Sequence, residues 1–158
     1  FKSWRNVARN FWWRKYFCTR SETSKKRKFE LTTKPETNFG REIMKNLSHV
    51  FWTRIENRHG GGIPDLYGIK GWKKSAWLEL KCIKQNSINL SPLQISWNYK
   101  HFRQGFNNYY IVRDTRSKVT KIYHGDKGRE LAEKGFSLPP EYEFDPPTDW
   151  WAFDYVIF

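Results

Sequence analysis

The sequence predicts an α/β fold, because segments with strand patterns alternate with segments with helix patterns along the middle of the chain. In residues 39–52 the apolar side chains recur at spacings of three and four, as on one face of an amphipathic helix. Residues 76–83 (AWLELKCI) form the short apolar run typical of a buried strand. The length of 158 residues suits one domain of ordinary size with a substantial core.

Turn and cap residues predict the remaining elements. After the glycine run 60–62, a strand is expected at 63–69, with a hairpin turn at 70–72. Ser91 before Pro92 is a typical helix start, so a helix is expected to run to about Gln104 and to end at Gly105. Strands at 109–113 and 119–123 and a short helix at 126–134 follow, and the prolines after Gly135 predict no long regular element.

The net charge of +13 is unevenly distributed along the chain. Residues 1–60 carry 15 Lys and Arg against 5 Asp and Glu, residues 61–134 carry 14 against 6, and residues 135–158 carry none against 5. We therefore divide the chain into a basic aromatic N-terminal extension or arm (1–38), a core (39–134) and an acidic aromatic C-terminal segment (135–158). Such asymmetry indicates nucleic acid as the partner of the basic part.

Several functional classes are excluded by composition. No run of about 18 apolar residues is present, so a transmembrane helix and a membrane partner are not expected. Cys18 and Cys82 resemble neither a zinc ligand set nor a disulfide framework, which favours a reducing compartment. The histidines have no metal-ligand spacing, and the glycine run lacks the Lys-Ser/Thr pair of a phosphate-binding loop.

Two acidic residues and a lysine form the informative cluster. Alternation in the 76–83 strand places Glu79 and Lys81 on one face, with Leu78 and Leu80 towards the core. A hairpin through the preceding turn brings Asp65 beside that pair. Two carboxylates near a lysine, with a backbone carbonyl as a further oxygen, suit a hard divalent cation such as Mg²⁺. These groups fit hydrolysis of a phosphodiester, with a metal-acidified water and a lysine that orients it or stabilises charge.

Each half of this cluster also has a simpler interpretation. An Asp after Pro is common in turns. A Glu-x-Lys pattern in a strand is often only an exposed cross-strand ion pair. The joint occurrence of both halves, at hairpin spacing and within a basic chain, is what favours a functional site.

The order of these landmarks resembles the PD-(D/E)xK nuclease superfamily. A helix with a Glu is followed by GIPD at 62–65 and, after about a dozen residues, by ELK at 79–81. The continuation LSPLQISW (90–97), a glycine and YYIVR (109–113) is similar to the VRR-NUC and Holliday-junction-resolvase-like branches. The resemblance spans about residues 39–114. It implies a mixed central sheet flanked by helices, with Mg²⁺ as the cofactor and Mn²⁺ as a substitute.

The resemblance also implies roles for the residues that match. Asp65 and Glu79 would be metal ligands together with the Leu80 backbone carbonyl. Lys81 would be the residue that orients the water or stabilises the transition state. Glu42 takes the place of the helical Glu that approaches the metal, with Glu56 as the alternative.

Gln94 matches a helical Gln that faces the active centre in related nucleases. For Glu42 the simpler interpretation is an exposed carboxylate paired with a basic neighbour on its own helix. For Gln94 it is a plain surface residue.

Basic side chains that neutralise phosphates are expected to give salt-sensitive, sequence-independent affinity. The candidates are Lys25, Lys26, Arg27, Lys28, Arg54, Arg58, Lys73, Lys74, Lys100 and Arg103. For any one of them, a solvated surface charge is the simpler interpretation. Trp4, Trp12 and Trp13 either stack on unpaired bases or pack against the core or a second subunit.

The combined prediction is a Mg²⁺-dependent DNA endonuclease, selective for branched or junction DNA, with RNA as an open alternative. Two copies would serve a four-way junction, so a homodimer is an expectation. The cytoplasm, or the host cytoplasm for a viral protein, is the expected location. Two alternatives remain: a non-catalytic nucleic-acid-binding module on this fold, and a basic structural protein of a nucleoprotein particle. The acidic segment either competes with DNA for the basic surface or closes the fold.

Overall fold

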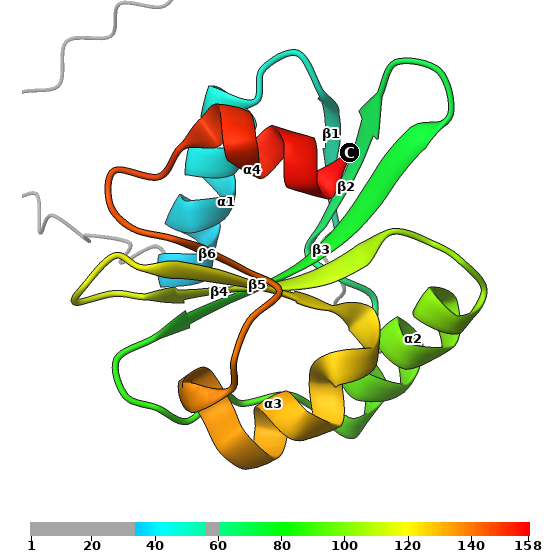
Figure 1. Ribbon diagram of the computed structural model, residues 1–158. Helices are drawn as coiled ribbons and strands as arrows, with labels where there is room; N and C mark the ends of the chain where they lie inside the picture. Colours follow the sequence, from blue (N-terminus) through cyan, green and yellow to red (C-terminus); the bar gives the residue numbers. More distant parts are fainter. Residues whose placement is uncertain (1–33, 56–60) are drawn as a thin grey trace, which may run out of the picture. The chain divides into compact units, whose positions relative to one another are not determined.

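A six-stranded mixed sheet forms the centre of the structure, which is a computed structural model that describes residues 34–55 and 61–158. The strands lie in the order β1-β2-β3-β4-β5-β6, and every neighbouring pair is antiparallel except β3 and β4. Helices α1 and α4 cover one face of the sheet, and α2 and α3 lie on the other (Figure 1). The predicted α/β fold with a mixed central sheet and flanking helices is therefore confirmed.

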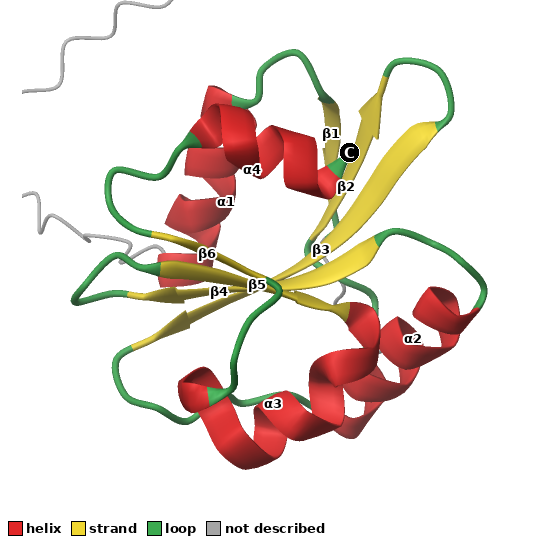
Figure 2. Ribbon diagram, in the orientation of Figure 1, coloured by secondary structure: helices red, strands yellow, loops and turns green. Residues whose placement is uncertain are grey.

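The elements, shown in Figure 2, are α1 (Pro35–Asn46), β1 (Phe51–Arg54), β2 (Leu66–Lys70), β3 (Lys74–Ile83), α2 (Pro92–Arg103), β4 (Asn108–Asp114), β5 (Thr120–His124), α3 (Gly128–Lys134), β6 (Tyr142–Phe144) and α4 (Trp150–Ile157). Two short 3₁₀ turns, Gly125–Lys127 and Gly135–Ser137, flank α3. Since β3 and β4 are parallel, α2 is the crossover helix between them. Each sheet face contributes its own buried cluster, one under α1 and α4 and one under α2 and α3.

The first helix differs from the sequence prediction of 39–52. It begins at Pro35, which occupies the first turn where a missing N–H costs nothing, and it ends at Asn46. Leu47 and Val50 are buried as the spacing indicates, but they pack from the turn that follows the helix. Phe51 instead starts β1, whose Phe-Trp-Thr content favours a strand once β2 lies beside it.

The elements around the predicted site match expectation closely. Leu78 and Leu80 are buried in the core on alternate positions of β3, as predicted. Ser91 caps α2 in a reciprocal capping box with Gln94, and the helix ends at Arg103 before Gly105, which has a φ of +82°. Local signals sufficed because each involves residues no more than a few positions apart.

The C-terminal segment joins the same structure. Strand β6 pairs with β5 at the edge of the sheet, which agrees with the closing strand considered from sequence. Phe153 and Ile157 of α4 are fully buried with the α1 cluster. The division of the chain at residues 38 and 134 stays a prediction about domains. Among the helices that the structure describes, none has the length and apolar character needed to cross a membrane.

Candidate active site

Beyond Leu78, one edge of β3 is no longer paired with its hairpin partner β2. Strand β2 begins at Leu66, which pairs with Leu78, so the following residues of β3 have no β2 neighbour. At this edge the Leu80 N–H donates to Asp65 Oδ2 at 2.8 Å. Because the N–H and C=O of one strand residue point to the same side, the Leu80 carbonyl faces this edge too.

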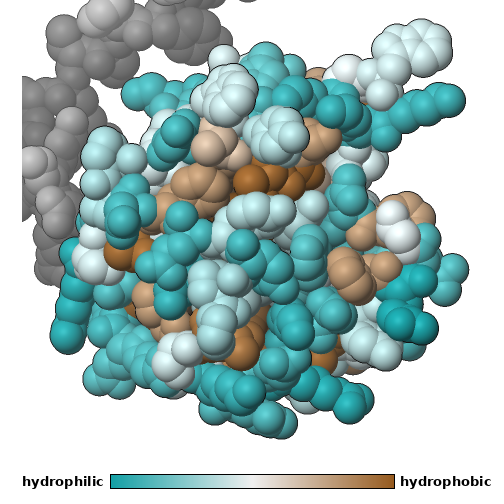
Figure 3. All heavy atoms as spheres, viewed as in Figure 1, coloured by the Kyte–Doolittle hydropathy of each residue, from teal (hydrophilic) through white to brown (hydrophobic). Residues whose placement is uncertain are grey.

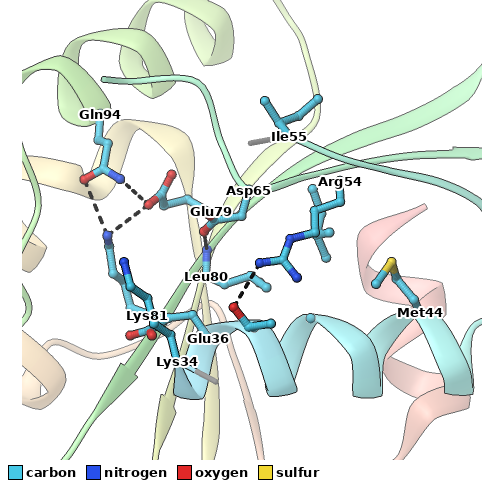
Figure 4. Close-up of a pocket in the computed structure, with 13 residues that line it drawn as sticks. Lys34, Glu36, Met44, Arg54, Ile55, Asp65, Glu79, Leu80, Lys81 and Gln94 are labelled. Carbon is cyan, nitrogen blue, oxygen red and sulfur yellow. Dashed lines mark hydrogen bonds and ion pairs between the residues drawn. The ribbon is translucent and has the colours of Figure 1, made fainter. Parts of the chain in front are cut away.

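Helix α1 reaches the same edge from the other side. The Cys82 N–H of β3 donates to Glu36 Oε1 at 3.3 Å, and Glu36 lies in the first turn of α1. Between the helix, the loop before β2 and the start of α2 lies a pocket of about 590 Å³ (Figure 4). The polar side chains that line it include Glu36, Arg54, Asp65, Glu79, Lys81 and Gln94.

Glu79 is the most buried acid of this pocket, at 1% relative exposure. Its Oε1 accepts from Lys81 Nζ at 3.0 Å and from Gln94 Nε2, whereas its buried Oε2 has no hydrogen-bond partner among the residues that the structure describes. Burial, and next the charge of Asp65, raises the pKa of Glu79 to about 7, against the lowering effects of Lys81 and Gln94. The unpartnered oxygen of a buried acid indicates room for another positive group.

Asp65 is half-buried at the bend before β2. Burial, the largest effect, raises its pKa, and the negative charge of Glu36 acts in the same direction. The Leu80 N–H and the positive charge of Lys81 lower the pKa but do not cancel the effect of burial. Two acids, Asp65 and Glu79, are thus held close together in a site that penalises their charge, an arrangement that a cation would relieve.

Lys81 and Gln94 complete the polar cluster. Lys81 Nζ lies 3.0 Å from Glu79 Oε1 and 3.5 Å from Gln94 Oε1. The same Gln94 oxygen accepts from the Ser91 N–H at 3.0 Å, so the cap of α2 fixes the amide that contacts Glu79 (Figure 4). The predicted residues Asp65, Glu79, Lys81 and Gln94 therefore lie in one pocket.

A divalent cation fits this donor set on chemical grounds. Within residues 34–55 and 61–158, no group of three or more His, Cys, Asp or Glu side chains is arranged to hold a metal ion. Two carboxylates and a backbone carbonyl nevertheless suit Mg²⁺, which usually keeps several of its waters. The free Oε2 of Glu79 is the observation that favours such an ion.

Glu42 lies away from the pocket. Its Oε2 pairs with Arg113 Nη1 at 2.6 Å, and that guanidinium lies over the Phe39 ring at 3.9 Å. Glu36 is the α1 acid that lines the pocket. Glu42 lies six positions after Glu36, which places the two acids about 9 Å apart along the helix axis and on different sides of it.

Sequence reasoning missed Glu36 because it falls within residues 1–38, which the charge distribution assigns to the basic N-terminal extension. Pro35 and a following acid form a helix-start signal that would have placed Glu36 in the first turn. Glu56, the alternative to Glu42, lies outside the described residues.

The predicted nucleic-acid contacts fall in different places. Arg54 lines the pocket and donates to Thr37 Oγ1 at 2.9 Å, while Lys73 and Lys74 are exposed at the β2–β3 hairpin. Lys100 lines a separate hollow between α2 and α3, and Arg103 is exposed in the last turn of α2. Lys25, Lys26, Arg27, Lys28 and Arg58 lie outside the described residues, as do Trp4, Trp12 and Trp13. All of these contacts stay predictions.

The sequence matches no protein-family model, and none of the curated proteins matches it. Among solved structures, the fold is similar to that of Hjc, a Holliday junction resolvase from the hyperthermophilic archaeon Archaeoglobus fulgidus. The two are 18% identical, with a TM-score of 0.49, over 70% of this chain and 88% of the resolvase.

Proposed function

We propose that this chain is a divalent-metal-dependent nuclease that hydrolyses phosphodiester bonds of DNA. The observation that carries the proposal is the convergence of Asp65, Glu79 and Lys81 at the open edge of β3, where a buried Glu79 oxygen has no partner within residues 34–55 and 61–158. Acids with raised pKa values in a pocket are typical of functional sites. Neither an exposed ion pair nor simple turn chemistry accounts for a buried acid with an unpartnered oxygen.

Each residue of the site has a role in this proposal. Asp65, Glu79 and the Leu80 carbonyl would hold Mg²⁺, or Mn²⁺ in its place, and the bound ion would supply an acidified water and neutralise phosphate charge. Lys81 would hold the attacking water or a non-bridging phosphate oxygen by donating a hydrogen bond. Gln94 would position Lys81 and Glu79 through the cap of α2.

In the reaction, the water oxygen bonds to phosphorus and its proton passes to solvent, while the bond from phosphorus to the leaving oxygen breaks and that oxygen takes up a proton from solvent. Arg54, on the pocket wall, is suited to contact a flanking phosphate. Glu36 is the α1 acid in reach of the same edge of β3 and is proposed to take the role expected of Glu42.

The finer parts of the proposal rest on the resemblance to the PD-(D/E)xK superfamily and its VRR-NUC and resolvase-like branches. They are selectivity for branched or junction DNA, action as a homodimer on a four-way junction, and a location where DNA is present. Sedimentation of the full chain, alone and with a junction, tests the dimer: a mass of one chain under both conditions contradicts it.

The nuclease proposal is tested by incubating the full chain with linear, flapped and four-way-junction DNA in Mg²⁺ or EDTA. We expect cleavage in Mg²⁺ only, abolished by Asp65→Asn. Asp145→Asn, which alters an exposed acid outside the pocket, is the matched control and should cleave normally. Absence of Mg²⁺-dependent cleavage on every substrate, or full cleavage by Asp65→Asn, contradicts the proposal.

A further inference from the structure

A row of aromatic side chains lies on the sheet face that adjoins the pocket. Phe51 pairs with Ile69, Thr53 with Tyr67, and Tyr67 with Trp77 across β1, β2 and β3. Directly paired residues of antiparallel strands point to the same face, so these side chains share one surface. We call this surface the aromatic face, defined by Phe51, Tyr67, Trp77, Trp97, His101 and Phe106.

Five of the six rings form a continuous row of neighbours from Tyr67 to Phe106, and Phe51 joins the face through its strand partner Ile69. The centroids of Tyr67 and Trp77 lie 4.3 Å apart, and those of Trp77 and Trp97 lie 5.2 Å apart. On α2, Trp97 stacks on His101 at 3.5 Å, and His101 lies 5.8 Å from Phe106. The two ends of the row are its most open parts: Phe51 is 71% exposed and Phe106 is 51% exposed.

This aromatic face is continuous with the candidate active site. Trp77 and Glu79 alternate onto the same face of β3, about 7 Å apart along the strand. Helix α2 runs beside the same part of β3. Gln94 contacts Glu79, and one helical turn later Trp97 contacts Trp77. A polymer held on the rings would therefore lead directly to the carboxylates.

The charge around the aromatic face favours a polyanion. Strand β1, the hairpin residues 66–78 and helix α2 contain no Asp or Glu. Their basic residues Arg54, Lys70 and Lys74 alternate onto the opposite face of the sheet, which leaves Lys73 at the hairpin turn and Lys100 and Arg103 on α2 as exposed positive charges. Asp154 of α4 belongs to that opposite face, where it pairs with Lys70 and His49. An acidic partner with flat apolar groups fits this combination of rings and positive charge.

The opposite face of the same strands is closed by the protein itself. Trp52 of β1 contacts Phe158 with centroids 5.9 Å apart, and a side chain at Gly68 would clash with both rings. Helix α4 also exposes two rings, Trp151 at 78% and Tyr155 at 76%, which stack on each other. In Figure 3, pale and brown side chains gather over α4 among hydrophilic ones. These two rings provide a matched comparison, since they are exposed but lie away from the pocket.

We propose that the aromatic face binds a single-stranded stretch of DNA, whose unpaired bases stack on its rings and whose backbone enters the pocket. Bases within a duplex have both faces covered by their neighbours, so only unpaired bases can stack in this way. The proposal rests on the proposed function and deepens it: the substrate carries unpaired nucleotides next to the phosphate that is cut, as flaps and open junctions do.

The test compares two double variants of the full chain, Phe51→Ala/Phe106→Ala and Trp151→Ala/Tyr155→Ala. Each removes two exposed rings, the first pair from the aromatic face and the second from α4. Binding to a fluorescent oligothymidylate and to a duplex of the same length is measured by anisotropy in EDTA, with thermal unfolding followed by circular dichroism. Because EDTA prevents cleavage, the result does not depend on whether the chain is a nuclease.

We expect the first variant to bind the single strand about tenfold or more weakly, with duplex affinity nearly unchanged. The α4 variant should match the parent protein on both ligands. Equal losses on single strand and duplex, or equal losses in both variants, overturn the proposal. Unchanged single-strand affinity together with loss of a dimer in sedimentation also overturns it and assigns the rings to an interface between copies.

Discussion

Strand β3 carries two different surfaces along one face. Its first half presents Trp77 among the rings of β2 and α2, and its second half presents Glu79 and Lys81. The difference comes from what lies beside each half: β2 pairs with the first half, whereas the second half borders a loop and the start of α1. One strand thus carries the proposed single-strand-binding surface and the proposed catalytic site two residues apart, and we expect their contributions to be separable.

The largest expected effect is on the kinetic constants, which should distinguish the two halves of β3. Glu79→Gln should lower the cleavage rate by more than about 100-fold, because it removes the charge of a proposed metal ligand, while single-strand binding in EDTA stays close to that of the parent. Trp77→Leu should instead raise KM about tenfold with little change in kcat. Steady-state kinetics on a flapped substrate measure both. A fall in kcat alone for Trp77→Leu would contradict the separation.

The second prediction concerns the pH dependence of the free energy of unfolding, which we expect to come from the half of β3 that carries Glu79 and Lys81. The pKa of Glu79 is raised to about 7 from its ordinary 4.5, so the folded protein keeps a proton that the unfolded chain releases. The free energy of unfolding without metal should therefore fall as pH rises through this window, by on the order of 3 kcal/mol.

Urea unfolding in EDTA at acidic and mildly alkaline pH measures this slope. Glu79→Gln should flatten this slope. With Mg²⁺ in place of EDTA, the parent protein should regain stability at the alkaline end, because the cation replaces the proton. Identical slopes for the parent and Glu79→Gln would show that Glu79 is not the group responsible.

A smaller effect is expected from the residue that joins the polar cluster to α2. Gln94→Ala should slow cleavage about 10- to 100-fold, since Glu79 and Lys81 lose a common partner. Ser91→Ala is the control, because it removes the hydroxyl cap but keeps the Gln94 amide. It should cost about 1 kcal/mol of stability with little loss of rate. If both variants slow cleavage equally, Gln94 acts only through the helix.

The smallest effects distinguish the two acids of α1. Glu36→Gln should reduce the cleavage rate by about tenfold through the change of charge near Asp65, with little loss of stability. Glu42→Gln should leave the rate unchanged and lower the free energy of unfolding by about 1 kcal/mol, because its half-exposed carboxylate pairs with Arg113. Cleavage rates and urea unfolding of both variants give the comparison, and the reverse pattern would restore Glu42 as the site acid.

The sequence by itself determined the parts of the site that depend on near neighbours in the chain. Alternation along β3 places Glu79 opposite the core residues Leu78 and Leu80, and a strand repeats every two residues. The Ser91–Gln94 capping box spans three residues and positions the start of α2. Such local patterns hold in almost any tertiary surrounding, which is why they could be predicted.

Only the tertiary structure decided which groups meet from distant parts of the chain. Glu36 and Cys82 are 46 positions apart, and Glu42 and Arg113 are 71 apart, so no local pattern indicates which acid of α1 faces the pocket. The same is true of the aromatic face, which needs the register of β1 on β2 and the packing of α2. The open edge of β3 exists because β2 begins only at Leu66, opposite Leu78, and strand register is a property of the fold.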